Sequence, residues 1–289
     1  MVLVLLIGFA AIPLFGITWD EIVAKANNGD AEAMRELGAQ YYQGTNVARD
    51  LQESFKWFLK AAENGNISAQ YAVSYLYENG EGVSQDSAKA FYWAKKSAEN
   101  GYEDSYTDLA YMYYRGYGCD VDYEKAVYWY KKGAENGETA AEHSLGYMYM
   151  EGEGVEKNTD EAIYWYKKSA AKGNRGSYLN LSKLIYEAKN EYDYPLALKY
   201  LRNLVEEDED NTAQYYLGLM YLEGLGVAKD PYEGFKWILK AAEQDNIKAM
   251  YKISDMYEEG IGTAKDSTKS VEWYDAAVEA EWGWLYWLY

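Results

Sequence analysis

Small and apolar residues recur in this chain at helical spacing, in segments that repeat along its length. In each segment an alanine-like residue, an apolar residue and a tyrosine stand at positions i, i+4 and i+8, as in Ala33, Leu37 and Tyr41. This spacing places the three side chains along one stripe of an α-helix. A glycine follows the stripe, here Gly44, and predicts that the helix ends there in the left-handed conformation.

Each of these glycines is followed by the start of a second predicted helix. An Asp or Asn marks the start, because its side chain accepts hydrogen bonds from the first free backbone N–H groups. The N-cap residues are Asp50, Asp86, Asp122, Asn158, Asp230 and Asp266. A Glu three residues later, at Glu53, Glu161 and Glu233, predicts a capping box.

The whole pattern repeats at an interval of 36 residues. The interval is marked by Trp57, Trp93, Trp129, Trp165, Trp237 and Trp273, and by the helix-ending glycines Gly44, Gly80, Gly116, Gly152, Gly224 and Gly260. Repeats of about 20–50 residues are typical of solenoids, in which each unit buries its apolar face against its neighbours. We therefore predict an all-α fold, a right-handed α/α superhelical solenoid of about seven helix-turn-helix repeats, with the tryptophans in its core.

The repeats make up one predicted solenoid domain, from residue 19 to residue 289. The units lie near 33–68, 69–104, 105–140, 141–176, 177–212, 213–248 and 249–284, with a partial next unit to 289. The fifth unit is degraded, because it lacks the Gly-x-Gly-Val loop and carries Tyr200 where tryptophan is expected. Gly38, Gly146 and Gly218 stand beside the stripe leucine, where glycine costs helix stability, and predict a close approach of the paired helix.

The consensus of these units resembles the Sel-one-like repeat (SLR) family, a relative of the tetratricopeptide solenoids. It reads as a small residue, then Leu-Gly, Tyr, Gly-x-Gly-Val, Asp, Lys-Ala and Trp-Tyr, followed by Lys-Ala-Ala-Glu-x-Gly. The resemblance covers roughly Thr18 to Tyr289. It implies that the first helices line a concave surface, and that the protein is a non-enzymatic scaffold or adaptor that mediates protein–protein interaction.

The candidate binding residues lie two and six positions after the leading alanine-like residue, away from the core stripe. They are Tyr71, Tyr75, Tyr111, His143, Tyr147, Tyr215, Leu219 and Tyr251. Tyrosine offers a large rigid contact area and a hydroxyl group at little entropic cost, which suits the recognition of peptides or glycans. The alternative interpretation is that these tyrosines pack between adjacent repeats.

The formal net charge of −19 narrows the range of partners. A chain this acidic is repelled by the phosphate backbone, so nucleic acid is not an expected partner. We expect protein or peptide segments that are apolar or carry Lys and Arg. A polysaccharide- or cell-wall-binding module is the alternative, with the same aromatic side chains stacked on sugar rings.

The sequence gives little support for catalysis or for the binding of a metal or cofactor. His143 and Cys119 are the only residues of their types, so a hydrolytic triad would have to use His143. We expect Cys119 to act as a small hydrophobe, and the run Glu206–Asp210 to form a solvated hinge. A β-lactam hydrolase is a remote alternative, because paired cysteines and Ser-x-x-Lys with its companion motifs are absent. We expect no cofactor and no metal.

The two termini carry separate predictions. Residues Val2 to Phe15 are apolar apart from glycine, and they are too short to span a bilayer comfortably. Segment 1–18 is therefore predicted to be a signal peptide, and the protein to be exported (secreted, periplasmic or in a secretory lumen), with a buried capping helix and a cytoplasmic protein as the alternative. Glu281 to Tyr289 begins another first helix and then stops, so either the chain is cut short or this edge docks onto something; we favour the first.

Overall fold

The computed structural model describes residues 18–283. Between these residues the chain forms fifteen α-helices, two short 3-10 helices and no β-strand, which confirms the predicted all-α solenoid of repeats. The chain divides into two compact units, residues 1–157 and 158–289. The division falls inside the fourth predicted repeat, and each unit is described by itself below.

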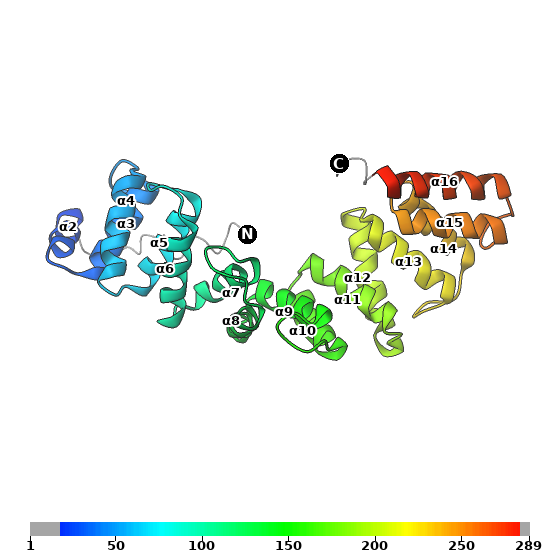
Figure 1. Ribbon diagram of the computed structural model, residues 1–289, viewed down its shortest axis with the longest axis horizontal. Coiled ribbons are helices and arrows are strands. Elements are labelled where there is room, and N and C mark those ends of the chain that lie inside the picture. The colour runs from blue at the N-terminus through cyan, green and yellow to red at the C-terminus, as the bar shows by residue number, and fades with distance from the viewer. Residues whose placement is uncertain (1–17, 284–289) are drawn as a thin grey trace. The chain divides into compact units, whose positions relative to one another are not determined.

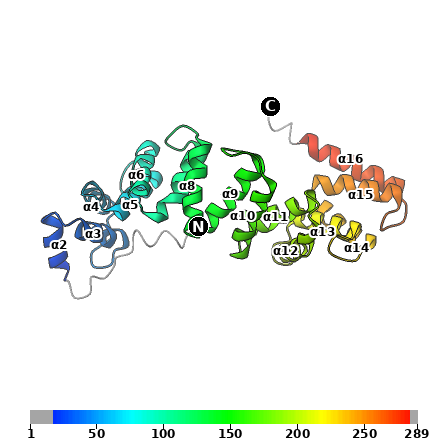
Figure 2. The same cartoon turned by 90° about the horizontal axis from the view of Figure 1, so that it is seen from below.

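The helices of the first unit are α2 (Trp19–Asn27), α3 (Ala31–Gln43), α4 (Leu51–Glu63), α5 (Ile67–Asn79), α6 (Ser87–Glu99), α7 (Tyr106–Arg115), α8 (Tyr123–Glu135) and α9 (Thr139–Glu151), with η1 (Glu103–Ser105) before α7. Those of the second unit are α10 (Thr159–Ala171), α11 (Arg175–Glu187), α12 (Tyr194–Glu207), α13 (Asn211–Glu223), α14 (Pro231–Ala242), α15 (Ile247–Glu259) and α16 (Ser267–Gly283), with η2 (Glu191–Asp193) before α12. Within each unit every helix packs against the next one along the chain, as Figures 1 and 2 show.

The predicted helix boundaries are confirmed. All six helix-ending glycines have positive φ angles between 68° and 80°, as predicted for the ends of the first helices. The N-cap side chains accept backbone hydrogen bonds; Asp50, for example, accepts from Gln52 and Glu53 at 2.9 and 3.0 Å. The predicted capping boxes are wrong. The backbone N–H of Asp50 already donates to the carbonyl of Tyr41, and the Glu53 carboxylate pairs with Lys56 at 2.6 Å instead.

The loop between the two helices of a repeat is seated on the preceding repeat. Gly82 in the second repeat has a φ of +69°, and a Cβ atom there would overlap the carbonyl oxygen of Leu51 at the start of α4. One repeat later, a Cβ atom on Gly118 would overlap the carbonyl oxygen of Ser87 at the start of α6. The Gly-x-Gly-Val loop is therefore a contact between repeats that only glycine allows.

The residue after the tryptophan is buried in five of the six repeats that carry one, and Tyr274 is the exception. Phe58 and Tyr166 are completely buried, whereas only Trp93 among the six repeat tryptophans is buried and the other five are half-buried. The prediction that the tryptophans form the core is therefore wrong for those five. Several carry a lysine over the ring; the Nζ of Lys60 lies 4.2 Å from the ring centroid of Trp57. This arrangement keeps one face of the indole near water.

The predicted close approach of the paired helices is confirmed at Gly38 and Gly218. A Cβ atom on Gly38 would lie 2.8 Å from the ring of Phe58, and one on Gly218 would lie 2.9 Å from the carbonyl oxygen of Gly234. Both separations are too short for real carbon atoms, so a side chain at either position would push the paired helices apart. These glycines set the spacing between the helices of a hairpin.

The fifth repeat replaces the glycine loop with an ion pair. Lys167 on α10 donates to both carboxylate oxygens of Asp193 at 2.7 Å, and Asn190 also donates to Asp193 at 2.8 Å. Asp193 is buried. A buried carboxylate needs a paired charge, so these bonds hold the shortened connection onto the preceding helix.

The acidic run of residues 206–210 is solvated as predicted, because residues 206–209 are exposed, but the prediction that it forms a hinge is wrong. Helix α12 continues to Glu207, and Arg175 pairs with both Glu207 and Asp208. Asp210 caps α13 by accepting from the N–H of Ala213 at 2.7 Å. Carboxylates that cap a helix or pair with arginine are fixed in place, so this run forms an ordered corner.

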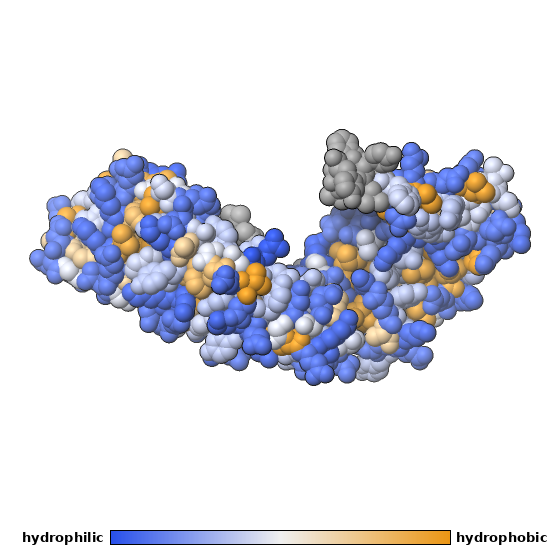
Figure 3. Space-filling view, viewed as in Figure 1, coloured by the Kyte–Doolittle hydropathy of each residue, from blue (hydrophilic) through white to orange (hydrophobic). Residues whose placement is uncertain are grey.

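The predictions for the termini lie outside the described residues. These are the signal peptide, which falls on residues 1–17, and the further first helix, most of which falls on residues 284–289. No helix within residues 18–283 is long and apolar enough to cross a membrane. The face of the protein seen in Figure 3 is mostly hydrophilic, with hydrophobic residues in scattered groups, as the high net charge leads one to expect.

Candidate functional site

The predicted binding residues differ in their exposure. Tyr111 is 52% exposed, and five others are half-buried: Tyr75, His143, Tyr147, Tyr215 and Tyr251. Tyr71 and Leu219 are buried, each only 6% exposed. The prediction that these two contact a ligand is therefore wrong, because both side chains are used up in packing between helices.

Tyr71 ties the second repeat to the third. Its hydroxyl group donates to the Oδ2 of Asp108 on α7 at 2.6 Å, and its ring lies 5.4 Å from that of Tyr102 just before η1. Burial raises the pKa of Tyr71 well above its ordinary value, and the Asp108 charge adds to the effect. Tyr71 thus stays a neutral donor and holds Asp108 in place.

Two triads of two tyrosines and a glutamate recur in the first unit. The hydroxyl of Tyr42 bonds to Glu81 and Tyr75, and that of Tyr114 lies within bonding reach of Glu153 and Tyr147. The two sets are 72 residues apart at every position. In both, burial is the main cause that raises the tyrosine pKa. The triads place a carboxylate next to half-buried tyrosine rings on alternate repeats.

A pocket of about 220 Å³ opens beside the second triad, between α7, α8 and α9. Its walls are Tyr111, Tyr114, Tyr130, His143, Ser144, Tyr147 and Met148. The structure thus brings together three of the predicted residues: Tyr111, His143 and Tyr147. We refer to these three residues with Tyr75 and Tyr114 as the tyrosine face.

Sequence reasoning missed Tyr114 and Tyr130. Tyr114 belongs to a series with a period of 72 residues, Tyr42, Tyr114 and Tyr186, and a search at twice the repeat length would have found it. Tyr130 follows the tryptophan and was included in the general Trp-Tyr pattern. It forms the buried floor of the pocket, and burial raises its pKa to about 12.

Carboxylates gather around the tyrosine face. Burial raises the pKa values of Glu78, Asp108 and Glu138, and the charge of Asp108 adds to the rise at the other two. The Asp108 side chain is itself exposed, so it is crowded by protein yet still open to solvent. We call these three residues the acidic group. Their mutual repulsion favours the binding of a cation nearby.

Positive charge is scarce on the same helices. Arg115 is the only Lys or Arg in the sequences of α5, α7 and α9. Desolvation lowers the pKa of His143, so its imidazole is neutral at pH 7. Helices α5, α7 and α9 therefore present aromatic rings in a negative field, which matches cationic groups. Helix α8, which supplies Tyr130 to the pocket, carries Lys125, Lys131 and Lys132.

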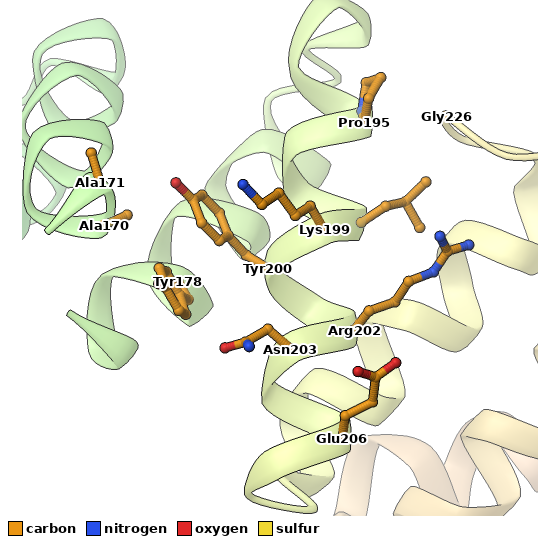
Figure 4. A pocket seen from close by; sticks show the side chains of 11 residues that line it. Ala170, Ala171, Tyr178, Pro195, Lys199, Tyr200, Arg202, Asn203, Glu206 and Gly226 are labelled. Atoms are coloured by element: carbon orange, nitrogen blue, oxygen red, sulfur yellow. The ribbon is translucent and has the colours of Figure 1, made fainter. Parts of the chain in front are cut away.

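A larger cavity of about 760 Å³ lies in the second unit, beside α12 (Figure 4). There Tyr178 and Tyr200 stack on each other with centroids 4.2 Å apart, and Lys199 and Asn203 lie on the same side of α12 as Tyr200. Because each ring covers one face of the other, less aromatic surface is free for a ligand. The fifth repeat lacks the loop and the tryptophan of the other repeats, and this loss accounts for the larger cavity. We therefore take the smaller pocket, between complete repeats, as the candidate site.

Six segments of the chain match the family model of the Sel1 repeat. The segments are 31–66, 67–102, 104–138, 139–174, 211–246 and 247–281. The chain belongs to the Sel1 repeat family. Residues 175–210, which hold most of the degraded fifth repeat (177–212), fall between the matched segments. Sel1 repeats are generally non-enzymatic scaffolds for protein interaction, as the resemblance implied.

Two solved structures of Sel1 repeat proteins are similar to this chain. One is c5321, described as a protective antigen of uropathogenic Escherichia coli strains with an SLR fold, at 34% identity and a TM-score of 0.66 over 91% of this chain. The other is a Sel1 repeat protein from Oxalobacter formigenes, at 30% identity and a TM-score of 0.59, with 93% of this chain and 79% of that one covered. This chain covers 56% of the length of c5321.

A shorter match is to a protein named for its partner. The secretory immunoglobulin A-binding protein EsiB of Escherichia coli O6:H1 is 33% identical over 57 residues, which make up 19% of this chain and 12% of EsiB. That name describes a protein that binds secretory immunoglobulin A.

Proposed function

We propose that the protein is a binding scaffold whose tyrosine face in the first unit recognises a cationic segment of a partner protein. The observation that carries the proposal is the combination of the exposed Tyr111 and half-buried aromatic side chains with the carboxylates of the acidic group. They lie on or next to α5, α7 and α9, whose sequences hold a single Lys or Arg, Arg115. Aromatic side chains supply most of the affinity in typical interfaces, and charge complementarity supplies orientation and association rate.

A matched pair of tyrosines tests this proposal. Tyr111 on α7 is 52% exposed and lies on the tyrosine face, whereas Tyr128 on α8 is 55% exposed and lies outside the pocket. We expect Tyr111→Ala to weaken the binding of a fluorescent arginine- and lysine-rich peptide at least tenfold, which corresponds to about 1.4 kcal/mol. Tyr128→Ala is expected to leave the affinity within a factor of two. Fluorescence anisotropy measures both.

Two outcomes would contradict the proposal. One is equal loss in both variants, or in neither. The other is binding on a glycan array that persists in excess basic peptide and is lost in Tyr111→Ala, which would favour the polysaccharide-binding alternative. The thermal unfolding of each variant is measured alongside, because both side chains are exposed and neither change should alter folding.

The affinity for a cationic peptide is expected to fall as the pH is lowered from 7. The acidic group has raised pKa values, so Glu78, Asp108 and Glu138 take up protons at a higher pH than ordinary carboxyls and lose their charge first. His143 has a lowered pKa, so it becomes cationic only below about 6.5, and its charge then repels the peptide as well. Titration calorimetry between pH 7.5 and pH 4.5 measures the decline. Asp108→Asn is expected to lower the affinity at pH 7 and flatten the profile, whereas an unchanged profile would exclude the acidic group as its source.

We also propose that the protein is exported. The apolar N-terminal segment supports this location, as does the likeness to proteins named as a protective antigen and as a binder of a secretory immunoglobulin. Expression of the full chain in a bacterium with an alkaline phosphatase reporter tests it: activity of the fusion outside the cytoplasm supports export, and cytoplasmic retention contradicts it.

A further inference from the structure

We infer that the pocket between α7, α8 and α9 is a socket for one arginine side chain, and that it selects arginine over lysine. The inference rests on the proposed function, since the arginine would belong to the cationic segment that binds the tyrosine face. It adds the identity of the anchoring residue and the place where that residue enters.

The size of the pocket fits a single side chain. Its volume of about 220 Å³ is below the roughly 300–1,000 Å³ of typical small-molecule sites. Four of its seven lining residues are tyrosines, and Met148 adds a flexible apolar surface suited to the methylene groups of a long side chain. A buried anchor in such a pocket is the usual form of an interface hot spot.

The lining favours a weakly hydrated planar cation. None of the seven lining residues is a carboxylate, so a lysine ammonium group would give up water without gaining a charged acceptor in the pocket. A guanidinium group is less strongly hydrated and stacks on aromatic faces, while its edge donates several hydrogen bonds. Tyr114 and Tyr147, whose rings are 6.4 Å apart and nearly perpendicular, offer one face and one edge to such a group.

An unsatisfied acceptor belongs to Glu153, the carboxylate next to the lining residue Tyr114. The Oε2 atom of Glu153 is buried and has no hydrogen-bond partner within residues 18–283, although the Glu153 carboxylate lies beside the Tyr114 hydroxyl. A buried carboxylate oxygen without a donor is costly, and a charged N–H group that reaches it would recover that cost. The several N–H groups of a guanidinium allow it to stack on a ring and donate to an oxygen at the same time.

His143 gives the inference a specific readout. It is the only histidine in the sequence and it forms part of the pocket wall, so the ring signals of a histidine-labelled sample report on this site alone. A cation bound next to the imidazole disfavours its protonation, so bound arginine is expected to lower the pKa of His143 further.

The test is an NMR titration of the full chain with single-residue probes, N-acetyl N-methylamides of arginine, lysine, citrulline and trimethyllysine. We expect the arginine probe to shift the His143 signals saturably, with an affinity at least fivefold higher than that of the lysine probe. The neutral citrulline probe is expected to cause no saturable shift. Tyr147→Ala and Glu153→Gln should each weaken arginine binding at least fivefold, and Tyr128→Ala should not, with thermal unfolding measured to confirm that every variant is folded.

The outcomes separate this inference from the proposed function. Equal or tighter binding of the lysine probe would overturn the arginine preference, and tighter binding of trimethyllysine would show a quaternary-ammonium site instead. If a basic peptide binds the tyrosine face but the arginine probe leaves His143 unshifted, the socket is wrong and the proposed function stands. If neither the peptide nor the probe binds, both are wrong.

Discussion

Replacing Phe58 with alanine is expected to lower the free energy of unfolding of the first unit by about 3–5 kcal/mol. The Phe58 side chain is fully buried, and its ring fills the space that Gly38 leaves open on α3. Removing the ring leaves a cavity next to Gly38, and the cost of that cavity adds to the loss of buried apolar surface. Urea denaturation followed by circular dichroism measures the change.

The neighbouring tryptophan provides the control. Trp57 is half-buried and lies under the Nζ of Lys60, so part of its surface remains hydrated in the folded state. Trp57→Ala is expected to cost less than about 2 kcal/mol, since less apolar area leaves water when the residue folds. A larger loss for Trp57→Ala than for Phe58→Ala would contradict the assignment of the core to the position after the tryptophan.

Replacing Gly82 with alanine is expected to be nearly as damaging, at about 2–5 kcal/mol. The left-handed conformation at φ +69° contributes about 1–2 kcal/mol for any residue with a Cβ atom. The overlap of that atom with the carbonyl oxygen of Leu51 forces the two repeats apart and adds about 1–3 kcal/mol. Thermal and urea unfolding of the variant measure the total.

Gly65 separates these two contributions. It has a similar positive φ of +88°, but a Cβ atom there would meet nothing within 4 Å. Gly65→Ala therefore carries only the conformational cost, about 1–2 kcal/mol. Equal effects of the two substitutions would show that the loop of the second repeat does not press on the first.

The hairpin architecture could be predicted almost completely from the sequence. Helix starts and stops depend on local chemistry, such as the Asp50 side chain that caps α4 and the left-handed Gly44 that ends α3. The close helix approach was also predictable, because glycine within a helix is costly and recurred at one register, as at Gly38. These features involve residues within one repeat, and the repetition made each of them visible several times.

How deeply a side chain is buried, and which residues of other helices it contacts, could not be predicted in the same way. The helical stripe shows which side of a helix faces its neighbours, but the burial of Tyr71 depends on Tyr102 at the end of its own repeat and on Asp108 in the next one. The prediction of a hinge at the acidic run failed because Arg175, more than thirty residues earlier, binds its carboxylates. Likewise, the capping box at Glu53 failed because the Tyr41 carbonyl already accepts the N–H of Asp50.

The seating of each glycine loop on the preceding helix has a consequence for how such chains can be lengthened or shortened. A cut at the sequence boundary of a repeat separates Gly82 from Leu51 and leaves the loop without its neighbour. The piece that keeps this loop contact within itself is instead the second helix of one repeat together with the first helix and loop of the next. Protein engineering that exchanges this offset cassette would keep Gly82 on Leu51, and its cut would fall inside a hairpin, between residues such as Gly38 and Phe58.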